Sequence, residues 1–190
     1  MNKPTNFNDL LELQRILDEQ IEKTRNNGFV PRGRSELDIL LSIDDEFQEW
    51  LRELPYEDNF KTWKQKEYSR EKELEELTDI LLFLLQYTLS FIKKEKQHKY
   101  DFSTIEKYMN KINYPFMFYD YFGESPNLEL AIKFFKIKIW INNYIDELFT
   151  AYFLIVNLRG VSKEKLLNTY WEKWQKNMTR INSDWILEGK

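Results

Sequence analysis

The sequence predicts an all-α protein with a single domain over residues 1–190. Several stretches carry apolar residues at helical spacing, and no stretch of useful length alternates apolar and polar residues as a half-buried strand does. Polar caps precede several of these stretches, as they do at helix starts. A chain of 190 residues that is 42% hydrophobic can enclose one sizeable core, so a second independent unit is not expected.

Two helices are expected before Pro55. The first runs from Leu10 to about Thr24, with Asn8-Asp9 as its cap and Glu12 completing a capping box with Asp9. The second starts at Ser35-Glu-Leu-Asp38 and ends at Pro55, which stops it. Its apolar residues form the stripe of a helix that faces a core.

The third helix is expected from roughly Glu71 to Ile92. It becomes apolar nearly all round at Ile80–Leu85, which is typical of the central helix of a bundle. A further short helix is expected to start at the capping box Ser103-Thr-Ile-Glu106. That helix falls within residues 93–125, which we interpret as a variable insert between core helices.

Two helices are expected in the last third of the chain. Ser125-Pro126 has the pattern of a helix start, and the apolar spacing then continues to about Leu158, where Arg159-Gly160 ends it. Ser162 is expected to cap the last helix.

Paired acids on consecutive helices are the candidate metal site. Glu46 and Glu49 precede Pro55, and Glu76 and Asp79 lie at the entrance to the apolar run. A spacing of three places each pair on one helical face, so two facing helices can offer four carboxylates to one small volume. Carboxylate oxygens are the ligands that Mg²⁺ prefers. Solvated helix faces are the alternative interpretation of the same pairs. Three neighbouring acids are interpreted as ordinary surface residues: Glu53, Glu73 and Glu75.

A polar stripe on the last helix is the candidate phosphate site. Lys173, Asn177 and Arg180 follow Tyr170 at i+3, i+7 and i+10, which places them on one face. A divalent cation and a basic stripe together can hold a polyphosphate, although such a stripe can also be a simple solvated face.

Composition excludes several classes of protein. A net charge of -4 with interspersed charges argues against a broad nucleic-acid-binding face, and no apolar run is long enough to span a membrane. The chain has no cysteine, hence no disulfide, thiol nucleophile or Cys-based zinc site. The cytosol is the expected compartment.

Motifs along nearly the whole chain resemble the dimeric, all-α dUTPases, and the phage type most closely. That family belongs with the MazG-like nucleoside triphosphate pyrophosphatases, which share an ExxE…ExxD magnesium site. The matching segments are Leu11-Glu-Leu-Gln14-x-x-Leu17-Asp18, Glu46-x-x-Glu49-Trp50, Phe60-Lys61-x-Trp63-Lys64, Glu76-Leu-x-Asp79-x-Leu-x-Phe83 and Tyr170-x-x-Lys173-x-x-x-Asn177-x-x-Arg180.

The resemblance implies a homodimeric, Mg²⁺-dependent enzyme that converts dUTP and water to dUMP and pyrophosphate. It assigns the metal to four residues: Glu46, Glu49, Glu76 and Asp79. Glu46 would also orient the attacking water. It assigns the phosphates to Lys173, Asn177 and Arg180, with Lys64 as a further candidate. Gln14 would contact the base, and Trp63 would wall the pocket.

Departures from the family leave the base selectivity open. The protozoal enzymes have Asn near Asp18 and His near Leu82, and this chain also departs from the Gln-x-x-Gly-Tyr continuation of the last motif. A related pyrophosphatase for dCTP or several nucleotides is therefore one alternative. A non-catalytic helical module that binds another protein is the other.

Overall fold

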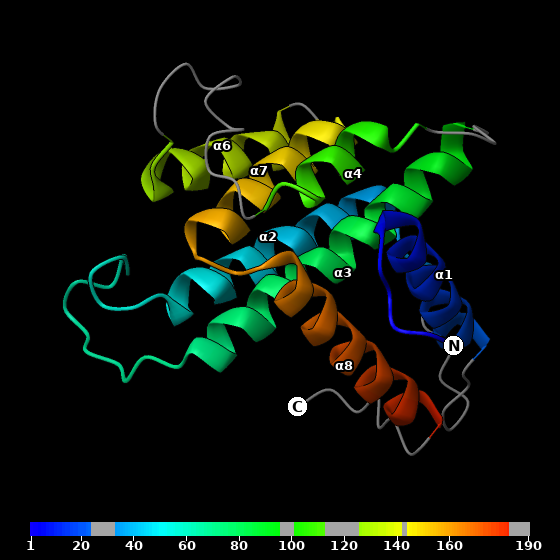
Figure 1. Ribbon diagram of the computed structural model, residues 1–190, viewed down its shortest axis with the longest axis horizontal. Helices are drawn as coiled ribbons and strands as arrows, with labels where there is room; N and C mark the ends of the chain where they lie inside the picture. Colours follow the sequence, from blue (N-terminus) through cyan, green and yellow to red (C-terminus); the bar gives the residue numbers. More distant parts are fainter. Residues whose placement is uncertain (24–32, 96–100, 113–125, 142–143, 183–190) are drawn as a thin grey trace.

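The computed structural model describes residues 1–23, 33–95, 101–112, 126–141 and 144–182, and it confirms the all-α prediction (Figure 1). The described residues form seven helices and no strand. The helices are α1 (Phe7–Lys23), α2 (Glu36–Glu53), α3 (Arg70–Glu95), α4 (Ser103–Met109), α6 (Leu128–Trp140), α7 (Ile145–Leu158) and α8 (Lys163–Asn182). None of them is long and apolar enough to cross a membrane.

Helix α3 is the central helix, as its apolar run predicted. It packs against α1, α2, α7 and α8, and it lies antiparallel to α2 in the middle of the molecule (Figure 1). Leu77, Leu81 and Leu84 on α3 are completely buried. The carbonyl of Leu77 also accepts a hydrogen bond of 2.8 Å from the buried Tyr152 hydroxyl of α7. Burial on several sides explains why this helix lacks a single apolar stripe.

Helices α1 and α8 cover one side of the α2–α3 pair, and α6 and α7 cover the other (Figure 1). The indole nitrogen of Trp174 donates to the carbonyl of Leu13 at 2.8 Å, which fixes α8 against α1. On the opposite side, the rings of Phe47 and Phe135 join α2 to α6. One continuous hydrophobic cluster includes residues from every helix.

Two predicted helix starts are confirmed. Ser35 accepts from the backbone N–H of Asp38, and the Asp38 carboxylate accepts from the backbone of Ser35, so a capping box stands at the expected start of α2. The hydroxyl oxygen of Ser162 accepts from the backbone N–H of Lys165 at the start of α8. Both caps satisfy backbone donors that the first turn leaves unpaired.

The predicted start of α1 is wrong by three residues. Helix α1 begins at Phe7, and Asn6 rather than Asn8 or Asp9 caps it, with the Asn6 side-chain oxygen accepting from the backbone N–H of Asp9 at 2.9 Å. Glu12 pairs with Arg15 instead of completing a box. The extra turn buries Phe7 completely against other rings of the core, a long-range gain that local cap signals do not reveal.

The predicted capping box of α4 is also wrong. Phe102 precedes the helix and makes no side-chain cap, and Ser103 lies within α4. Glu106 instead accepts a hydrogen bond of 2.7 Å from the backbone N–H of Phe7, so it satisfies a donor at the start of α1. Ile105 and Met109 are completely buried, which makes α4 part of the core although it lies in the stretch interpreted as an insert.

The single helix expected from Pro126 to about Leu158 is two helices, α6 and α7, that pack against each other. Asn127 caps α6 through the backbone N–H of Leu130, and Ser125 lies outside the described residues. Because α6 and α7 pack against each other, each can bury an apolar face on the other, which one long helix cannot do. The predicted end of α7 is confirmed, because Gly160 has a φ of 62° in the left-handed region that favours glycine.

The interpretation of Glu73 as a surface acid is wrong. Its side chain is completely buried on α3, where it accepts from Arg159 Nε at 2.6 Å, Arg70 Nη1 at 2.8 Å and the Tyr68 hydroxyl at 2.6 Å. Arg159 lies at the end of α7 and also pairs with Asp58 in the loop between α2 and α3. This buried network therefore ties that loop to both helices.

Candidate active site

Three of the four predicted metal ligands meet between α2 and α3. Glu46, Glu49 and Glu76 each offer a carboxylate oxygen, and these oxygens all lie within 4.8 Å of one another. The spacing of three places Glu46 and Glu49 on one face of α2, and the packing of α2 against α3 brings Glu76 opposite them. Glu49 is exposed and the other two are half-buried, so the cluster is open to solvent on one side.

Asp79, the fourth predicted ligand, is paired with a lysine. Its Oδ2 atom accepts from Lys173 Nζ of α8 at 2.7 Å. Lys173 Nζ also contacts Oε1 of Glu75 at 3.1 Å, so the ammonium lies between two acids of α3. The charge of Asp79 nevertheless acts on Glu46 and Glu76, which places it beside the cluster.

Burial and crowding make these carboxylates weak acids. Burial raises the pKa of Glu46 to about 7, and the negative charges of Asp79, Glu49 and Glu76 add to the effect. Burial likewise raises the pKa of Glu76 to about 7, again with Asp79 and Glu49 contributing. Burial raises the pKa of Asp79, although Lys173 opposes that shift. Closely spaced acids that resist ionisation together are a donor set whose repulsion a bound divalent cation relieves.

The three residues of the predicted phosphate stripe lie at different depths on α8. Lys173 reaches the acids, with 15% of its side chain exposed, whereas Asn177 is half-buried and Arg180 is exposed. Because they follow one another by about one turn, they form a line that leads away from the acids. Such a line can follow a chain of phosphates that starts at the carboxylates.

Gln14, the predicted base contact, is buried in a polar network. Its Nε2 atom donates to Oδ1 of Asp18 at 2.8 Å, and Gln86 of α3 donates to the same oxygen at 3.0 Å. The Tyr170 hydroxyl of α8 lies 3.4 Å from Oε1 of Gln14. Burial raises the pKa of Asp18 to about 6, and the hydrogen bonds from Gln14 and Gln86 oppose that shift.

Sequence reasoning missed Gln86 and Glu75. It named Asp18 only as a departure from the family, although the i, i+4 spacing of Gln14 and Asp18 on α1 could have indicated their contact. Gln86 and Glu75 gave no comparable signal, because their partners lie on helices distant in sequence.

Trp63 and Lys64 lie in the loop between α2 and α3, which extends away from the helices (Figure 1). Trp63 is 78% exposed, so it is not covered by any other described part of the chain, and Lys64 is exposed as well. Lys66 in the same loop pairs with Glu53 at the end of α2. The structure therefore does not bring Trp63 against the acid cluster.

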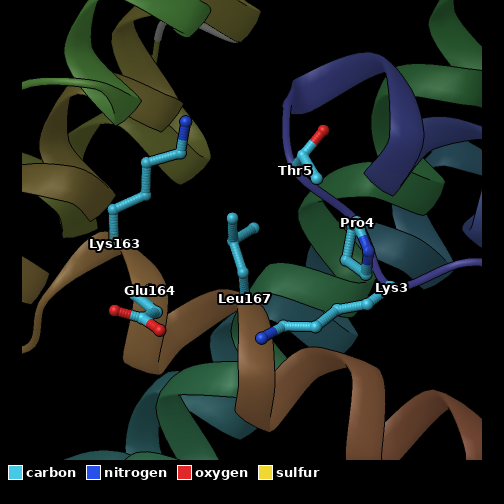
Figure 2. Close-up of a pocket in the computed structure, with 6 residues that line it drawn as sticks. All are labelled: Lys3, Pro4, Thr5, Lys163, Glu164 and Leu167. Atoms are coloured by element: carbon cyan, nitrogen blue, oxygen red, sulfur yellow. The ribbon is translucent and has the colours of Figure 1, made fainter.

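A hollow of about 400 Å³ lies elsewhere, between the N-terminal segment and the start of α8 (Figure 2). It is lined by Lys3, Pro4, Thr5, Lys163, Glu164 and Leu167, and it shares no residue with the acid cluster. Most of its surface is apolar, and Figure 2 shows Leu167 at its centre. The carboxylates rather than this hollow carry the chemistry of a hydrolytic site.

The fold and the site define a class of protein. It is an all-α protein in which two packed helices present closely spaced carboxylates, the donor chemistry of enzymes that use a divalent cation on phosphates. A comparison with protein families finds that the model of the family described as dUTPase matches residues 6–185. The chain therefore belongs to the all-α dUTPase family that its motifs indicated, and it is a dUTP diphosphatase whose substrate is dUTP. A search of curated proteins found no match.

Proposed function

We propose that the protein hydrolyses dUTP to dUMP and pyrophosphate with Mg²⁺ held by Glu46, Glu49, Glu76 and Asp79. The observation that carries this proposal is the meeting of three carboxylates from two helices within 4.8 Å. The donors are all oxygens, which suits a hard cation. When bound, Mg²⁺ would neutralise charge on the phosphates and lower the pKa of a coordinated water.

Glu46 is the proposed catalytic residue. Its carboxylate would hold the attacking water in line with a phosphorus and accept the proton that this water loses. Without a metal, burial raises the pKa of Glu46 to about 7, and a bound cation would lower it, so Glu46 would be ionised and able to accept a proton at neutral pH. Water can attack directly, so no covalent intermediate with the protein is required.

The phosphates are assigned to α8. Lys173 already contacts Asp79 beside the acid cluster, and Asn177 and Arg180 continue along the same face of the helix. Arg180 offers a planar set of donors that matches phosphate oxygens. Lys64 would join them from the loop between α2 and α3.

The proposed contacts with the base require two rearrangements. Gln14 is 3% exposed and its amide donates to Asp18, so it must change partners before it can bind a nucleobase. Trp63 must move with its loop before it can wall the pocket. Both movements would accompany substrate binding, since the nucleotide supplies the new contacts.

We also propose that the protein is a homodimer. The run Ile80–Leu85 does not require a partner, because the chain itself buries most of it. In the apolar stretch Phe134–Ile141, Ile137 on α6, at 49% exposure, and Ile141, at 72%, remain as exposed apolar residues. Analytical ultracentrifugation should give about twice the chain mass of 23.4 kDa, and a fully active monomer would contradict the proposal.

Removal of divalent cations tests the metal site. Pyrophosphate release from dUTP should stop in protein treated with a chelator and return as Mg²⁺ is added. Glu76→Gln should require a higher Mg²⁺ concentration, whereas the control Glu71→Gln, an exposed acid on the same helix, should not. An undiminished rate in chelator would overturn the proposal.

A panel of deoxynucleoside triphosphates tests the base selectivity. We expect dUTP to be hydrolysed much faster than dCTP under the same conditions. Equal rates on both would contradict specificity for dUTP while leaving the metal site intact. A single turnover in ¹⁸O-labelled water, followed by mass analysis of dUMP and pyrophosphate, identifies the phosphorus that is attacked.

A further inference from the structure

The position of Lys173 is the starting observation. Its ammonium lies 2.7 Å from Oδ2 of Asp79 and 3.1 Å from Oε1 of Glu75, two acids one turn apart on α3. Only 15% of the Lys173 side chain and 16% of the Asp79 side chain are exposed, whereas 43% of Glu75 is exposed. Lys176, three residues after Lys173 on α8, also contacts Glu75, at 3.4 Å.

A cation at this position competes with a metal. Asp79 is proposed to bind the divalent cation, yet one of its oxygens is already held by Lys173 at the distance of a charge-assisted hydrogen bond. Within the described residues no ion pair is recorded for Glu46, Glu49 or Glu76, although the charge of Lys173 also opposes the rise in the pKa of Glu76. Lys173 therefore neutralises one edge of the cluster.

We infer that Lys173 is a built-in counter-ion that a divalent cation displaces from Asp79, and that Glu75 then keeps the displaced ammonium beside the site, where it meets the phosphates. This inference rests on the proposed metal site. Glu75 is a positioning residue in this scheme, because it acts through Lys173 and does not contact the nucleotide. Cation binding and nucleotide binding are thereby coupled through one side chain.

If a divalent cation displaces Lys173 from Asp79, then replacing Lys173 with a neutral residue should have opposite effects on the binding of the cation and of the nucleotide. Without the ammonium, a cation no longer has to break the pair with Asp79 and no longer meets a positive charge beside it, so its affinity should rise by about five- to tenfold. The affinity for a nucleotide should fall, because the phosphates lose a contact. A residue that only stabilises the fold, or only binds phosphate, would not strengthen cation binding.

Titration of Mn²⁺ into metal-free protein without nucleotide, followed by the electron paramagnetic resonance of free Mn²⁺, measures the first effect. Lys173→Met and Lys173→Gln should both bind Mn²⁺ more tightly than the unsubstituted protein. Two neutral replacements are used because the apolar one removes the contact with Asp79 whereas the amide can retain it. Thermal melting verifies that each variant is folded.

Lys176→Met is the matched control. Lys176 lies on the same helix and contacts the same Glu75, but it is 53% exposed and its recorded ion pair does not involve Asp79. Its loss should change Mn²⁺ affinity by less than about twofold, as expected for an exposed charge pair.

Glu75→Gln tests whether Glu75 holds the displaced ammonium of Lys173, separately from the displacement itself. It should weaken binding of a non-hydrolysable dUTP analogue in the presence of Mn²⁺ without weakening Mn²⁺ binding alone. Equal or weaker Mn²⁺ binding in both Lys173 variants would overturn the exchange while leaving the metal site in place. Failure of the unsubstituted protein to bind Mn²⁺ would instead overturn the metal site, and this inference with it.

Discussion

Replacing Glu73 with glutamine should remove about 3 kcal/mol from the free energy of unfolding. Glu73 is completely buried, and its carboxylate accepts from Arg159, Arg70 and Tyr68. Glutamine keeps the shape but removes the charge, and it turns an N–H donor toward guanidinium groups that need acceptors. Breaking a buried ion pair from one side costs about 3–5 kcal/mol.

The lower end of that range applies here because both arginines keep other partners. Arg159 still pairs with Asp58, and Arg70 still donates to the backbone carbonyl of Arg159. Arg70 is also 40% exposed, so water can solvate it. For a domain of this size, a loss of about 3 kcal/mol corresponds to a fall of about 6–12 °C in the melting temperature.

Urea denaturation monitored by circular dichroism measures the loss. Glu71→Gln is the control, because Glu71 is an exposed acid two residues earlier on the same helix and should cost less than about 0.5 kcal/mol. A loss below about 1 kcal/mol for Glu73→Gln would refute the argument that this network stabilises the fold.

The pH dependence of the difference in the free energy of unfolding between the unsubstituted protein and Glu73→Gln is a second test. Burial alone would raise the pKa of Glu73, but hydrogen bonds from Arg159 and Tyr68 and the charge of Arg159 lower it overall. The charged carboxylate therefore stabilises the native state above its unfolded pKa of about 4.3, and this contribution is lost as the pH falls through the lower native value. The gap between the unsubstituted protein and Glu73→Gln should narrow below about pH 4.

Three further predictions concern the active site. At saturating Mg²⁺, Glu46→Gln should keep nucleotide binding but lower kcat by about 10²- to 10⁴-fold, and near-normal turnover would show that another carboxylate holds the water. Mn²⁺ affinity should rise between about pH 6 and pH 8, because Glu46 and Glu76, with pKa values of about 7, must lose their protons before they bind a cation. A Mn²⁺ affinity that does not change across this pH range would contradict the prediction. Trp63→Ala should leave the melting temperature nearly unchanged, since Trp63 is 78% exposed, but should raise KM for dUTP; an unchanged KM would mean that the loop does not reach the substrate.

Local spacing was sufficient to predict the all-α fold and which acids share a helical face. Each acid pair shares a helical face because residues three apart lie about one turn apart, whatever the surrounding structure. The starts of α2 and α8 followed from signals that are also local, at Ser35 and Ser162. The apolar run of α3 likewise indicated a helix buried on several sides.

Tertiary structure alone decided which polar residues meet across the fold. Asp79 and Lys173 are 94 residues apart, Glu73 and Arg159 are 86 apart, and the backbone of Phe7 meets Glu106 at a separation of 99. The periodicity of the sequence does not indicate such long-range contacts, so Glu73 resembled a surface acid and Glu106 resembled the cap of its own helix. The partner of a buried charge is set by which helices pack together, and that choice depends on the apolar core as a whole.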